Sequence, residues 1–333
     1  MALHILIIRF SSIGDIVLSS PVMRCLKNAY PDCHISYVTK KGYAKLLEAN
    51  PYVDRILSLD DNWTSLKQEL KNNSFDYIFD LHHNLRSKRL VRGLSGEYYA
   101  FRKLNPEKWL LVNFKINRLP KIHIVDRYLA TTKCLAIEYD GLGLDFFIPE
   151  TTTLPALPDR PFVAVAIGGQ HRTKRMPLIK LIELIEHINS PLVLLGGKED
   201  KEVADELCQK LPDQSILNYC GAISLNQSAL ILTKAKGLAT HDTGMMHIAA
   251  ALDVPIISIW GNTVPEFGMY PFYPKSSAGA RNAKIFEVNG LKCRPCSKIG
   301  YDSCPKGHFN CMNLQQTELI AQALNRLPSV QEK

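Results

Sequence analysis

The chain has 333 residues, which is long for one globular domain and favours two. Its 46% hydrophobic and 22% charged content is typical of a globular protein, and no run reaches the roughly 20 apolar residues of a membrane-spanning helix. The formal net charge of +8 favours an anionic partner such as a nucleotide, a phospholipid surface or a nucleic acid. The start "MALHILIIRFSS" lacks the features of a signal peptide, so we expect a cytoplasmic protein.

Short apolar runs alternate with helical patterns through the first half. Strands are expected at 4–10, 34–39, 55–59, 76–81 and 97–102. Helices are expected to begin near Asp15, Lys41, Trp63 and Leu85, and a longer one is expected over 123–137. Pro21 falls inside the first helix and should kink it or distort its first turns. The alternation predicts a parallel sheet covered by helices on both sides.

The first strand leads into "FSSIGDIVLSS", residues 10–20. A strand that turns into a helix is a common phosphate site in α/β proteins. This loop, however, has only Gly14 and carries a carboxylate, Asp15. The spacing alone favours an ordinary first-turn acid at Asp15, because carboxylates are stabilised at helix N-termini.

A basic stretch follows between residues 86 and 103. It carries Arg86, Lys88, Arg89, Arg92, Arg102 and Lys103 against only Glu97. These side chains form either a solvated helix face or a docking site for an anionic molecule.

The segment 149–161 contains four prolines and three threonines, which is typical of a linker. The alternation then starts again, with strands expected at 162–169, 191–197, 237–240 and 254–261 and helices at 178–188, 198–211, 224–235 and 245–252. We therefore expect two doubly wound domains, 1–155 and 156–333. Such sheets bind ligands outside the carboxyl ends of their strands, so the active site is expected in the cleft between the two domains.

The loop "GGQHRTKRMP", 168–177, leaves the first of these strands. It carries His171, Arg172, Lys174 and Arg175, which suit a diphosphate but also occur in ordinary solvated loops.

Two further loops follow strands of the second half. In "LATHDTGMMHIAAAL", Asp242, Thr243 and Gly244 stand where the first N–H groups of a helix are free, which suits either a phosphate or a plain helix cap. In "LLGGKEDKE", Glu199 and Asp200 could accept hydrogen bonds from ribose hydroxyls or merely favour the helix dipole.

Motifs that the sequence lacks narrow the classes further. Neither leading strand is followed by G-x-G-x-x-G, which argues against a nicotinamide enzyme, and there is no P-loop. There is also no D-x-D pair for a metal–nucleotide complex. A diphosphate bound without a metal ion must be neutralised by cations and backbone N–H groups, and the loops at 168–177 and 240–247 offer both.

Three segments together resemble glycosyltransferase family nine, the ADP-heptose:lipopolysaccharide heptosyltransferases. They are "RFSSIGDIVLSSPV" at the N-terminus, "TKRMP" after the second-half strand, and "HDTGMMHIAAALDVPIISIWGNTVPE" over 241–266. The likeness runs over nearly the whole chain, and D-T-G-x-x-H followed by a strand and G-x-T-x-P is its most specific part. It implies the GT-B fold, in which two Rossmann-like domains face each other across a cleft.

The resemblance also implies the reaction. Family members invert the anomeric centre without a metal ion, so the chain is expected to move a heptose or related sugar from ADP-heptose to an inner-core lipopolysaccharide acceptor. That acceptor is a lipid-linked saccharide at the inner membrane, which implies peripheral attachment to its cytoplasmic face.

Residue roles follow from the same resemblance. Asp15 is expected to be the general base, and Asp242 to accept hydrogen bonds from the donor sugar. The other expected donor-site residues are Lys174, Arg175, Glu199, Thr243, Gly244, Met245 and His247. The expected acceptor-binding residues are Ser11, Ser12, Gly14, Arg86, Lys88 and Arg89. Met176 departs from the family, which often has an aromatic residue after the Lys-Arg pair.

Four of the nine cysteines cluster in "CRPCSKIGYDSCPKGHFNCM": Cys293, Cys296, Cys304 and Cys311. They are candidate ligands of a structural zinc ion, but reduced thiols or a disulfide fit the spacing as well.

Two other functions stay open at this point. One is a sugar-nucleotide epimerase or hydrolase on the same fold, which needs no acceptor. The other is a basic, metal-clustered protein that binds nucleic acid with a steep salt dependence. The base of the donor, the acceptor position and the oligomeric state are not determined by the sequence.

Overall fold

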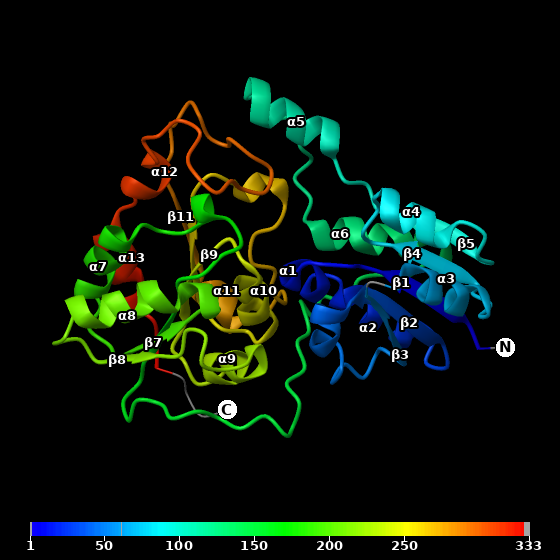
Figure 1. Cartoon of the computed structure of the whole chain (residues 1–333), viewed down its shortest axis with the longest axis horizontal. Coiled ribbons are helices and arrows are strands. Elements are labelled where there is room, and N and C mark those ends of the chain that lie inside the picture. Colours follow the sequence, from blue (N-terminus) through cyan, green and yellow to red (C-terminus); the bar gives the residue numbers. More distant parts are fainter. Residues whose placement is uncertain (1, 61, 330–333) are drawn as a thin grey trace. The chain divides into compact units, whose positions relative to one another are not determined.

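The computed structural model describes residues 2–60 and 62–329, and the chain divides into two compact units (Figure 1). Unit 1 comprises Met1–Lys103 and Ile122–Pro149, and unit 2 comprises Leu104–Lys121 and Glu150–Lys333. The chain passes from unit 1 into unit 2 for the last time after Pro149, close to the expected boundary at 155/156. The segment 104–121, however, belongs with unit 2, because Leu111 packs there against Val264 and Phe267.

Unit 1 is built on a five-stranded parallel sheet with the order β3-β2-β1-β4-β5. Its strands are β1 (His4–Ile8), β2 (His34–Lys40), β3 (Arg55–Leu59), β4 (Tyr77–Asp80) and β5 (Glu97–Ala100). Its helices are α1 (Ile13–Val17), α2 (Ser20–Ala29), α3 (Trp63–Lys71), α4 (Leu85–Val91) and α6 (Ile124–Leu129), with the 3₁₀ helices η1 (Lys41–Leu46) and η2 (Ala130–Leu135). All five expected strands are confirmed.

The helices of unit 1 differ from the expectation in three places. The first helix is interrupted after α1, and Pro21 stands in the first turn of α2. Backbone N–H groups in the first turn have no acceptor within the helix, so a proline is tolerated there. The helix expected near Lys41 is the 3₁₀ helix η1, and the helix expected over 123–137 is α6 continued by η2. The helical pattern thus gave the positions of these segments but not their hydrogen bonding.

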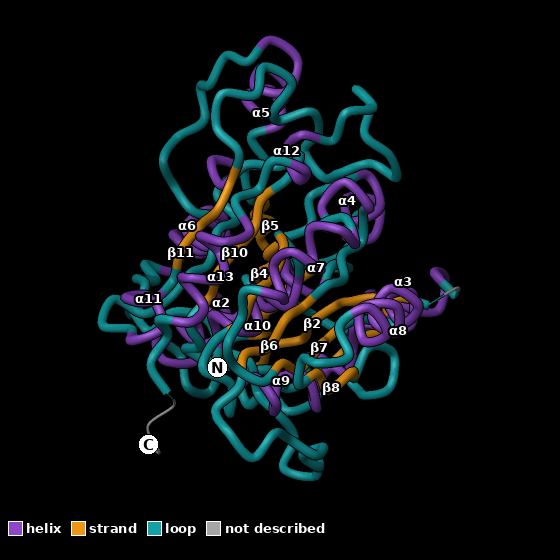
Figure 2. The backbone as a smooth tube through the Cα atoms, turned by 90° about the vertical axis from the view of Figure 1, so that its left-hand side faces the viewer, coloured by secondary structure: helices purple, strands orange, loops and turns teal. Residues whose placement is uncertain are grey.

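Unit 2 holds a six-stranded parallel sheet with the order β11-β10-β9-β6-β7-β8, whose strands are orange in Figure 2. The strands are β6 (Val163–Ala166), β7 (Leu192–Leu195), β8 (Ile216–Asn218), β9 (Leu238–His241), β10 (Ile256–Trp260) and β11 (Lys284–Glu287). The helices are α5 (Asn105–Phe114), α7 (Leu178–Glu186), α8 (Lys201–Lys210), α9 (Leu225–Leu232), α10 (Gly244–Ala251), α11 (Ala278–Asn282), α12 (Asn310–Asn313) and α13 (Thr317–Asn325), with 3₁₀ helices η3 (Arg172–Lys174), η4 (Lys198–Asp200) and η5 (Pro265–Phe267). The expected strands β6, β7, β9 and β10 are confirmed, whereas β8, β11, α5, α11, α12 and α13 were not expected.

Each sheet has one point where the strand order reverses. In unit 1 it lies between β1 and β4, and in unit 2 between β6 and β9. The strands on either side are mostly buried, as expected for parallel strands covered on both faces. Ligands of doubly wound sheets bind outside the carboxyl ends of the strands at these reversals. The loops after β1, β4, β6 and β9 are therefore where a site is sought.

Within the part of the chain that the structure describes, no helix combines the length and the apolar character needed to cross a membrane.

Candidate active site

Asp15 lies in the first turn of α1, directly after β1. Its Oδ2 accepts hydrogen bonds from the backbone N–H of Ser12 at 3.2 Å and from the Ser12 hydroxyl at 2.9 Å. Ser12 and Asp15 thus form a capping box that fixes the carboxylate at the start of the helix. The sequence predicted this position for Asp15.

Arg9 holds the other carboxylate oxygen of Asp15. Its Nη2 lies 2.5 Å from Oδ1 of Asp15, and its Nη1 donates to the carbonyl of Leu81 at 2.6 Å. Tyr128 of α6 donates to the same Oδ1 at 3.4 Å, and its ring centre lies 5.8 Å from the guanidinium of Arg9. The ion pair therefore bridges the carboxyl ends of β1 and β4, at the reversal point of the sheet.

The pair is largely buried, since the Arg9 and Asp15 side chains are only 10% and 15% exposed. Burial by itself raises the pKa of the Asp15 carboxyl, but the charge of Arg9 and the hydrogen bonds from Ser12 outweigh it and hold the pKa at about 2. Burial and the charge of Arg9 lower the pKa of the neighbouring His82 to about 3. Asp15 is consequently an oriented, ionised carboxylate at neutral pH.

The expected acceptor residues fall into two groups in unit 1. Ser11 and Ser12 are half-buried beside Asp15, and Gly14 is buried in the first turn of α1. Arg86, Lys88 and Arg89 are exposed on α4. No described contact joins the α4 cations to the Asp15 loop, so the structure brings the first group together with the carboxylate but not the second.

The loop that leads into α4 is organised by a buried carboxylate, Asp80, at the end of β4. It accepts from the N–H groups of His82 and His83 at 3.0 and 2.6 Å, from the Ser87 hydroxyl at 2.6 Å and from the Tyr98 hydroxyl at 2.9 Å. Four donors on one carboxylate satisfy its buried charge and fix where α4 begins.

In unit 2, Lys174 and Asp242 meet at the reversal between β6 and β9. Nζ of Lys174 lies 2.6 Å from Oδ2 of Asp242 and 3.2 Å from its backbone oxygen. Thr263, from the loop after β10, donates to the same Oδ2 at 2.9 Å. The ammonium is thereby fixed next to the start of α10.

The start of α10 offers backbone donors beside that ammonium. Thr243 is the N-cap residue, and the helix begins at Gly244 and Met245, whose N–H groups have no acceptor within the helix. A Cβ added to Gly169 in the loop after β6 would lie 3.3 Å from Cγ2 of Thr243. The two loops therefore pack closely, and a cation and free N–H groups converge on one place, as an anion requires.

Arg175 lies in the same loop but is turned towards the interior. It donates to the Gly169 carbonyl at 2.5 Å and pairs with Asp200 at 2.9 Å, and Asp200 also accepts from the N–H of Gly197. Glu199, one residue earlier in η4, is exposed. The structure thus gives Arg175 and Asp200 a part in ordering the loops after β6 and β7, and Glu199 is the carboxylate with solvent access.

Two residues of unit 2 that the resemblance drew attention to, the predicted His247 and the divergent Met176, are buried. His247 lies on the buried face of α10. Met176 packs in the hydrophobic core, and its N–H donates to Nε2 of His241 at 3.0 Å. Burial lowers the pKa of His241 to about 4, which keeps this imidazole neutral and able to accept that hydrogen bond. The Met176 side chain therefore fills the core.

The four clustered cysteines are free thiols, so the disulfide alternative is not formed. Cys293 Sγ lies 3.8 Å from Nε2 of His308, and burial raises the pKa of Cys311 to about 12. Across residues 2–60 and 62–329, no three His, Cys, Asp or Glu side chains are close enough together to hold a metal ion. Zinc binding by Cys293, Cys296, Cys304 and Cys311 stays a prediction, which metal analysis of the purified protein tests.

The carboxylates of the two sites also contact three residues to which the sequence assigned no role: Arg9, Tyr128 and Thr263. Arg9 stands at the end of β1, six residues before Asp15, and this proximity was the one available signal. Thr263 is the threonine of the G-x-T-x-P motif, which marked the residue but not its contact with Asp242, 21 residues away. Tyr128 lies 113 residues from Asp15, and no motif in the sequence pointed to it.

Known proteins resemble this chain over most of its length. The family model described as glycosyltransferase family 9 (heptosyltransferase) matches residues 63–301. The chain is 25% identical to lipooligosaccharide heptosyltransferase 2 of Haemophilus influenzae, over 90% of this chain and 93% of that protein. It is 24% identical to lipopolysaccharide heptosyltransferase 1 of Pseudomonas aeruginosa, over 89% and 86% of the two chains.

Solved structures show the same fold. ADP-heptose lipopolysaccharide heptosyltransferase II of Escherichia coli is similar with a TM-score of 0.66 at 21% identity, covering 96% of this chain and 99% of that one. Heptosyltransferase WaaC of E. coli, solved with ADP, gives a TM-score of 0.65 at 22% identity and covers 81% and 91%. The predicted GT-B fold of two Rossmann-like units is confirmed. Since the family model spans more than half of its length, the chain belongs to glycosyltransferase family 9, the heptosyltransferase family, and is a glycosyltransferase.

Proposed function

We propose that the protein transfers a heptose from ADP-heptose to an inner-core lipopolysaccharide acceptor and inverts the anomeric centre. The observation that carries the proposal is the convergence of Lys174, Asp242 and the free N–H groups of α10, which suits a nucleoside diphosphate. Relatives named as lipopolysaccharide and lipooligosaccharide heptosyltransferases support the sugar and the acceptor. Neither alternative, an epimerase or hydrolase or a nucleic-acid-binding protein, finds support among these relatives.

The proposed chemistry is a single displacement. An acceptor hydroxyl attacks the anomeric carbon of the donor, the bond from that carbon to the diphosphate oxygen breaks, and ADP leaves. Asp15 takes the proton of the attacking hydroxyl. Because its pKa is only about 2, Asp15 is a weak base, and the proton is expected to move late, when the attacking oxygen already carries positive charge.

Negative charge grows on the diphosphate as the bond to the sugar breaks. In the proposed complex, Lys174 and the N–H groups of Gly244 and Met245 stabilise it, and Asp242 shares Lys174 with the ligand while accepting from a sugar hydroxyl. This set of donors provides the neutralisation that other glycosyltransferases obtain from a metal ion. We therefore propose that transfer continues in the presence of a chelator such as EDTA.

Nucleotide preference tests the proposed donor. A thermal-shift series with ADP, UDP and GDP should show the largest stabilisation for ADP, since a ligand at 100 times its Kd adds roughly 2.7 kcal/mol of apparent stability. ADP-heptose should then yield ADP and product only when an inner-core acceptor is added. A clear preference for UDP contradicts the donor, and ADP-heptose turnover without any acceptor contradicts the transfer reaction.

The pH dependence of transfer tests the Arg9–Asp15 pair. With a pKa of about 2, Asp15 stays ionised between pH 5 and 8, and the described titratable groups around it have pKa values below that range (His82) or above it (Tyr37, Tyr128). The Arg9→Met variant removes the cation and leaves burial to raise the Asp15 pKa. Its transfer rate should therefore fall as the pH is lowered from 8 to 5, because protonation of Asp15 removes the general base.

The Arg9→Lys variant is the matched control, because it keeps a cation beside Asp15. Between pH 5 and 8, its transfer rate should depend on pH as little as that of the unchanged protein. If the Arg9→Met profile is as flat as the Arg9→Lys profile, Arg9 does not control the charge of Asp15.

A further inference from the structure

One face of unit 2 carries exposed aromatic residues that no described neighbour covers. On α5, Trp109 and Phe114 are 54% and 59% exposed, and Ile116 just after the helix is also exposed. The rings of Trp109 and Phe114 stack edge to face, with centres 5.2 Å apart, so they form one apolar knob. Leu111 on the opposite side of α5 packs against Val264 and Phe267, which anchors the helix to unit 2 and turns the knob outward.

Exposed cations surround this knob. Lys115, Arg118 and Lys121 follow α5 and are all exposed. The ammonium of Lys115 donates to the backbone oxygens of Val112, Cys293 and Pro295, at 2.7, 3.2 and 2.7 Å. Carbonyl oxygens do not neutralise its charge, and these bonds tie α5 to the loop that carries the clustered cysteines.

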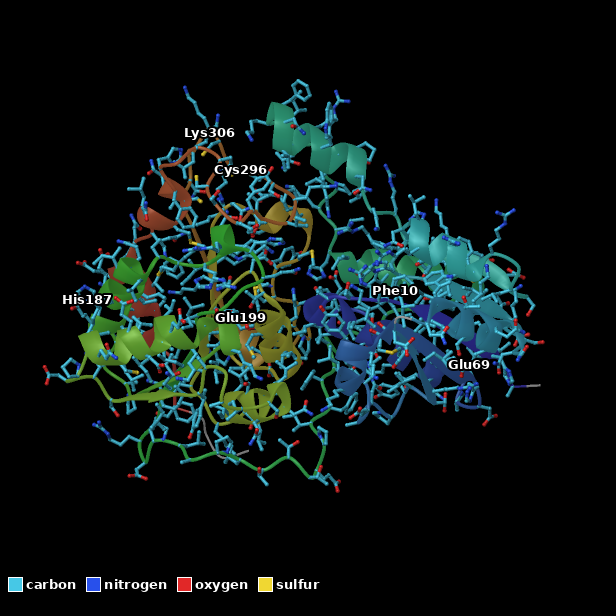
Figure 3. All side chains as sticks on the ribbon, in the orientation of Figure 1. Phe10, Glu69, His187, Glu199, Cys296 and Lys306 are labelled. Atoms are coloured by element: carbon cyan, nitrogen blue, oxygen red, sulfur yellow. The ribbon has the colours of Figure 1, made fainter. Side chains whose placement is uncertain are left out.

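That loop, residues 289–309, lies beside α5 in both views (Figures 1 and 2). It adds exposed Lys298, Ile299 and Lys306, and Figure 3 shows Lys306 at its outer edge with Cys296 further in. Residues 104–121 and 289–309 together contain eight basic residues against two acidic ones. One of the eight, Arg294, has a largely buried side chain and pairs with Glu287 at 2.7 Å, so the remaining net charge is +5, beside +8 for the whole chain. The basic character of this face is therefore a local concentration.

We propose that α5 and the 289–309 loop form a docking surface for an anionic lipid bilayer. An exposed Trp and Phe flanked by Lys and Arg is the composition with which proteins bind the membrane interface, because the rings enter the headgroup region while the cations meet anionic lipids. The exposed residues of 104–121 and 289–309 include a single carboxylate, Asp302, which argues against a basic protein partner on this face. The surface goes beyond the proposed reaction, since binding a bilayer requires neither donor nor acceptor.

Vesicle sedimentation measures this binding directly. The full-length protein is mixed with vesicles of phosphatidylglycerol and phosphatidylcholine at a 3:7 ratio, or of phosphatidylcholine alone, without nucleotide or acceptor. We expect cosedimentation with the anionic vesicles that weakens as salt is raised. The variant Trp109→Ser/Phe114→Ser should lower the partition coefficient at least tenfold, and Arg118→Gln/Lys121→Gln should lower it for the anionic vesicles only.

The matched control is Ile179→Ser/Leu319→Ser, which removes two exposed apolar side chains from α7 and α13 of the same unit. It should bind vesicles like the unchanged protein. A second readout does not depend on removing the aromatic pair: brominated lipid should quench tryptophan fluorescence in the unchanged protein, and Trp109→Phe should abolish the quenching but keep sedimentation. Quenching that survives in Trp109→Phe means that another tryptophan enters the lipid and overturns the proposal.

Three further outcomes overturn the proposed docking surface. The first is no binding to anionic vesicles, and the second is an equal loss of vesicle binding in the control variant. The third is concentration-dependent self-association that Trp109→Ser/Phe114→Ser abolishes, which would assign the face to a second copy of the chain. Stabilisation by ADP should be unchanged in every variant. Failure of vesicle binding with intact ADP stabilisation refutes the docking surface alone, whereas loss of ADP selectivity refutes the proposed donor.

Discussion

Asp15→Asn should reduce transfer by 10²-fold or more and leave ADP binding nearly unchanged. The amide keeps the size of the side chain and can still accept hydrogen bonds from Ser12, but it cannot take a proton, and general-base assistance is typically worth 10²–10⁴-fold. Nucleotide binding is expected to persist because Lys174 and α10 belong to unit 2, whereas Asp15 belongs to unit 1. Single-turnover transfer and ADP thermal shift measure the two effects separately.

Asp126→Asn is the matched control for this variant. Asp126 occupies the same capping-box position in α6 that Asp15 occupies in α1, and it accepts from the N–H of His123 at 3.0 Å. The control variant should lose little activity, because Asp126 is exposed and has no place in the proposed chemistry. If both variants lose transfer equally, or if Asp15→Asn weakens ADP binding and spares turnover, Asp15 is a helix-capping acid and the proposed mechanism is wrong.

Lys174→Ala should lower both ADP affinity and the rate of the chemical step. The side chain is fixed by Asp242, 2.6 Å away, next to the free N–H groups of α10. Charge on the diphosphate grows during bond breaking, so the cation stabilises the transition state more than the bound donor, and a loss of about 10²–10³-fold in turnover is expected. Rapid quench with ADP-heptose and calorimetry with ADP measure the two losses.

Lys201→Ala serves as the control for a lost lysine charge. Lys201 pairs with Asp205 at 2.7 Å on the surface of α8, and most of its side chain is exposed. Its removal should change neither parameter beyond experimental scatter, since exposed ion pairs contribute little. Unchanged turnover in Lys174→Ala would mean that Lys174 only neutralises Asp242, and the diphosphate site would have to lie elsewhere.

The local pattern of the sequence was sufficient to predict secondary structure where a segment is buried and regular. The runs that became β1, β6, β7 and β10 are almost entirely apolar and buried, because parallel strands covered on both faces keep water from most of their side chains. The edge strands β8 and β11 are short and only partly buried or exposed, so their sequences carry no such pattern. Pairing with a neighbouring strand decides their conformation.

In the candidate site, too, the sequence predicted some features and not others. Asp15, Lys174 and Asp242 could be named from the chain because each follows a strand and stands at or near the start of a helix, and the order of motifs resembles one family. The sequence could not show that Arg175 is turned inward onto Asp200, or that Met176 fills the core. Side-chain direction at a loop depends on which partner lies within reach.

The sequence by itself determined two doubly wound units and the family, and it located the loops in which we place the reacting groups, because strand periodicity and helix starts are properties of neighbouring residues. Only the tertiary structure decided that residues 104–121 pack with unit 2, and that Arg9 and Tyr128 contact the carboxylate of Asp15. Sheet order sets such contacts by bringing together the ends of strands that are distant in the chain. The charge state of Asp15 follows from that proximity, since a buried carboxylate stays ionised only when a cation and hydrogen-bond donors reach it.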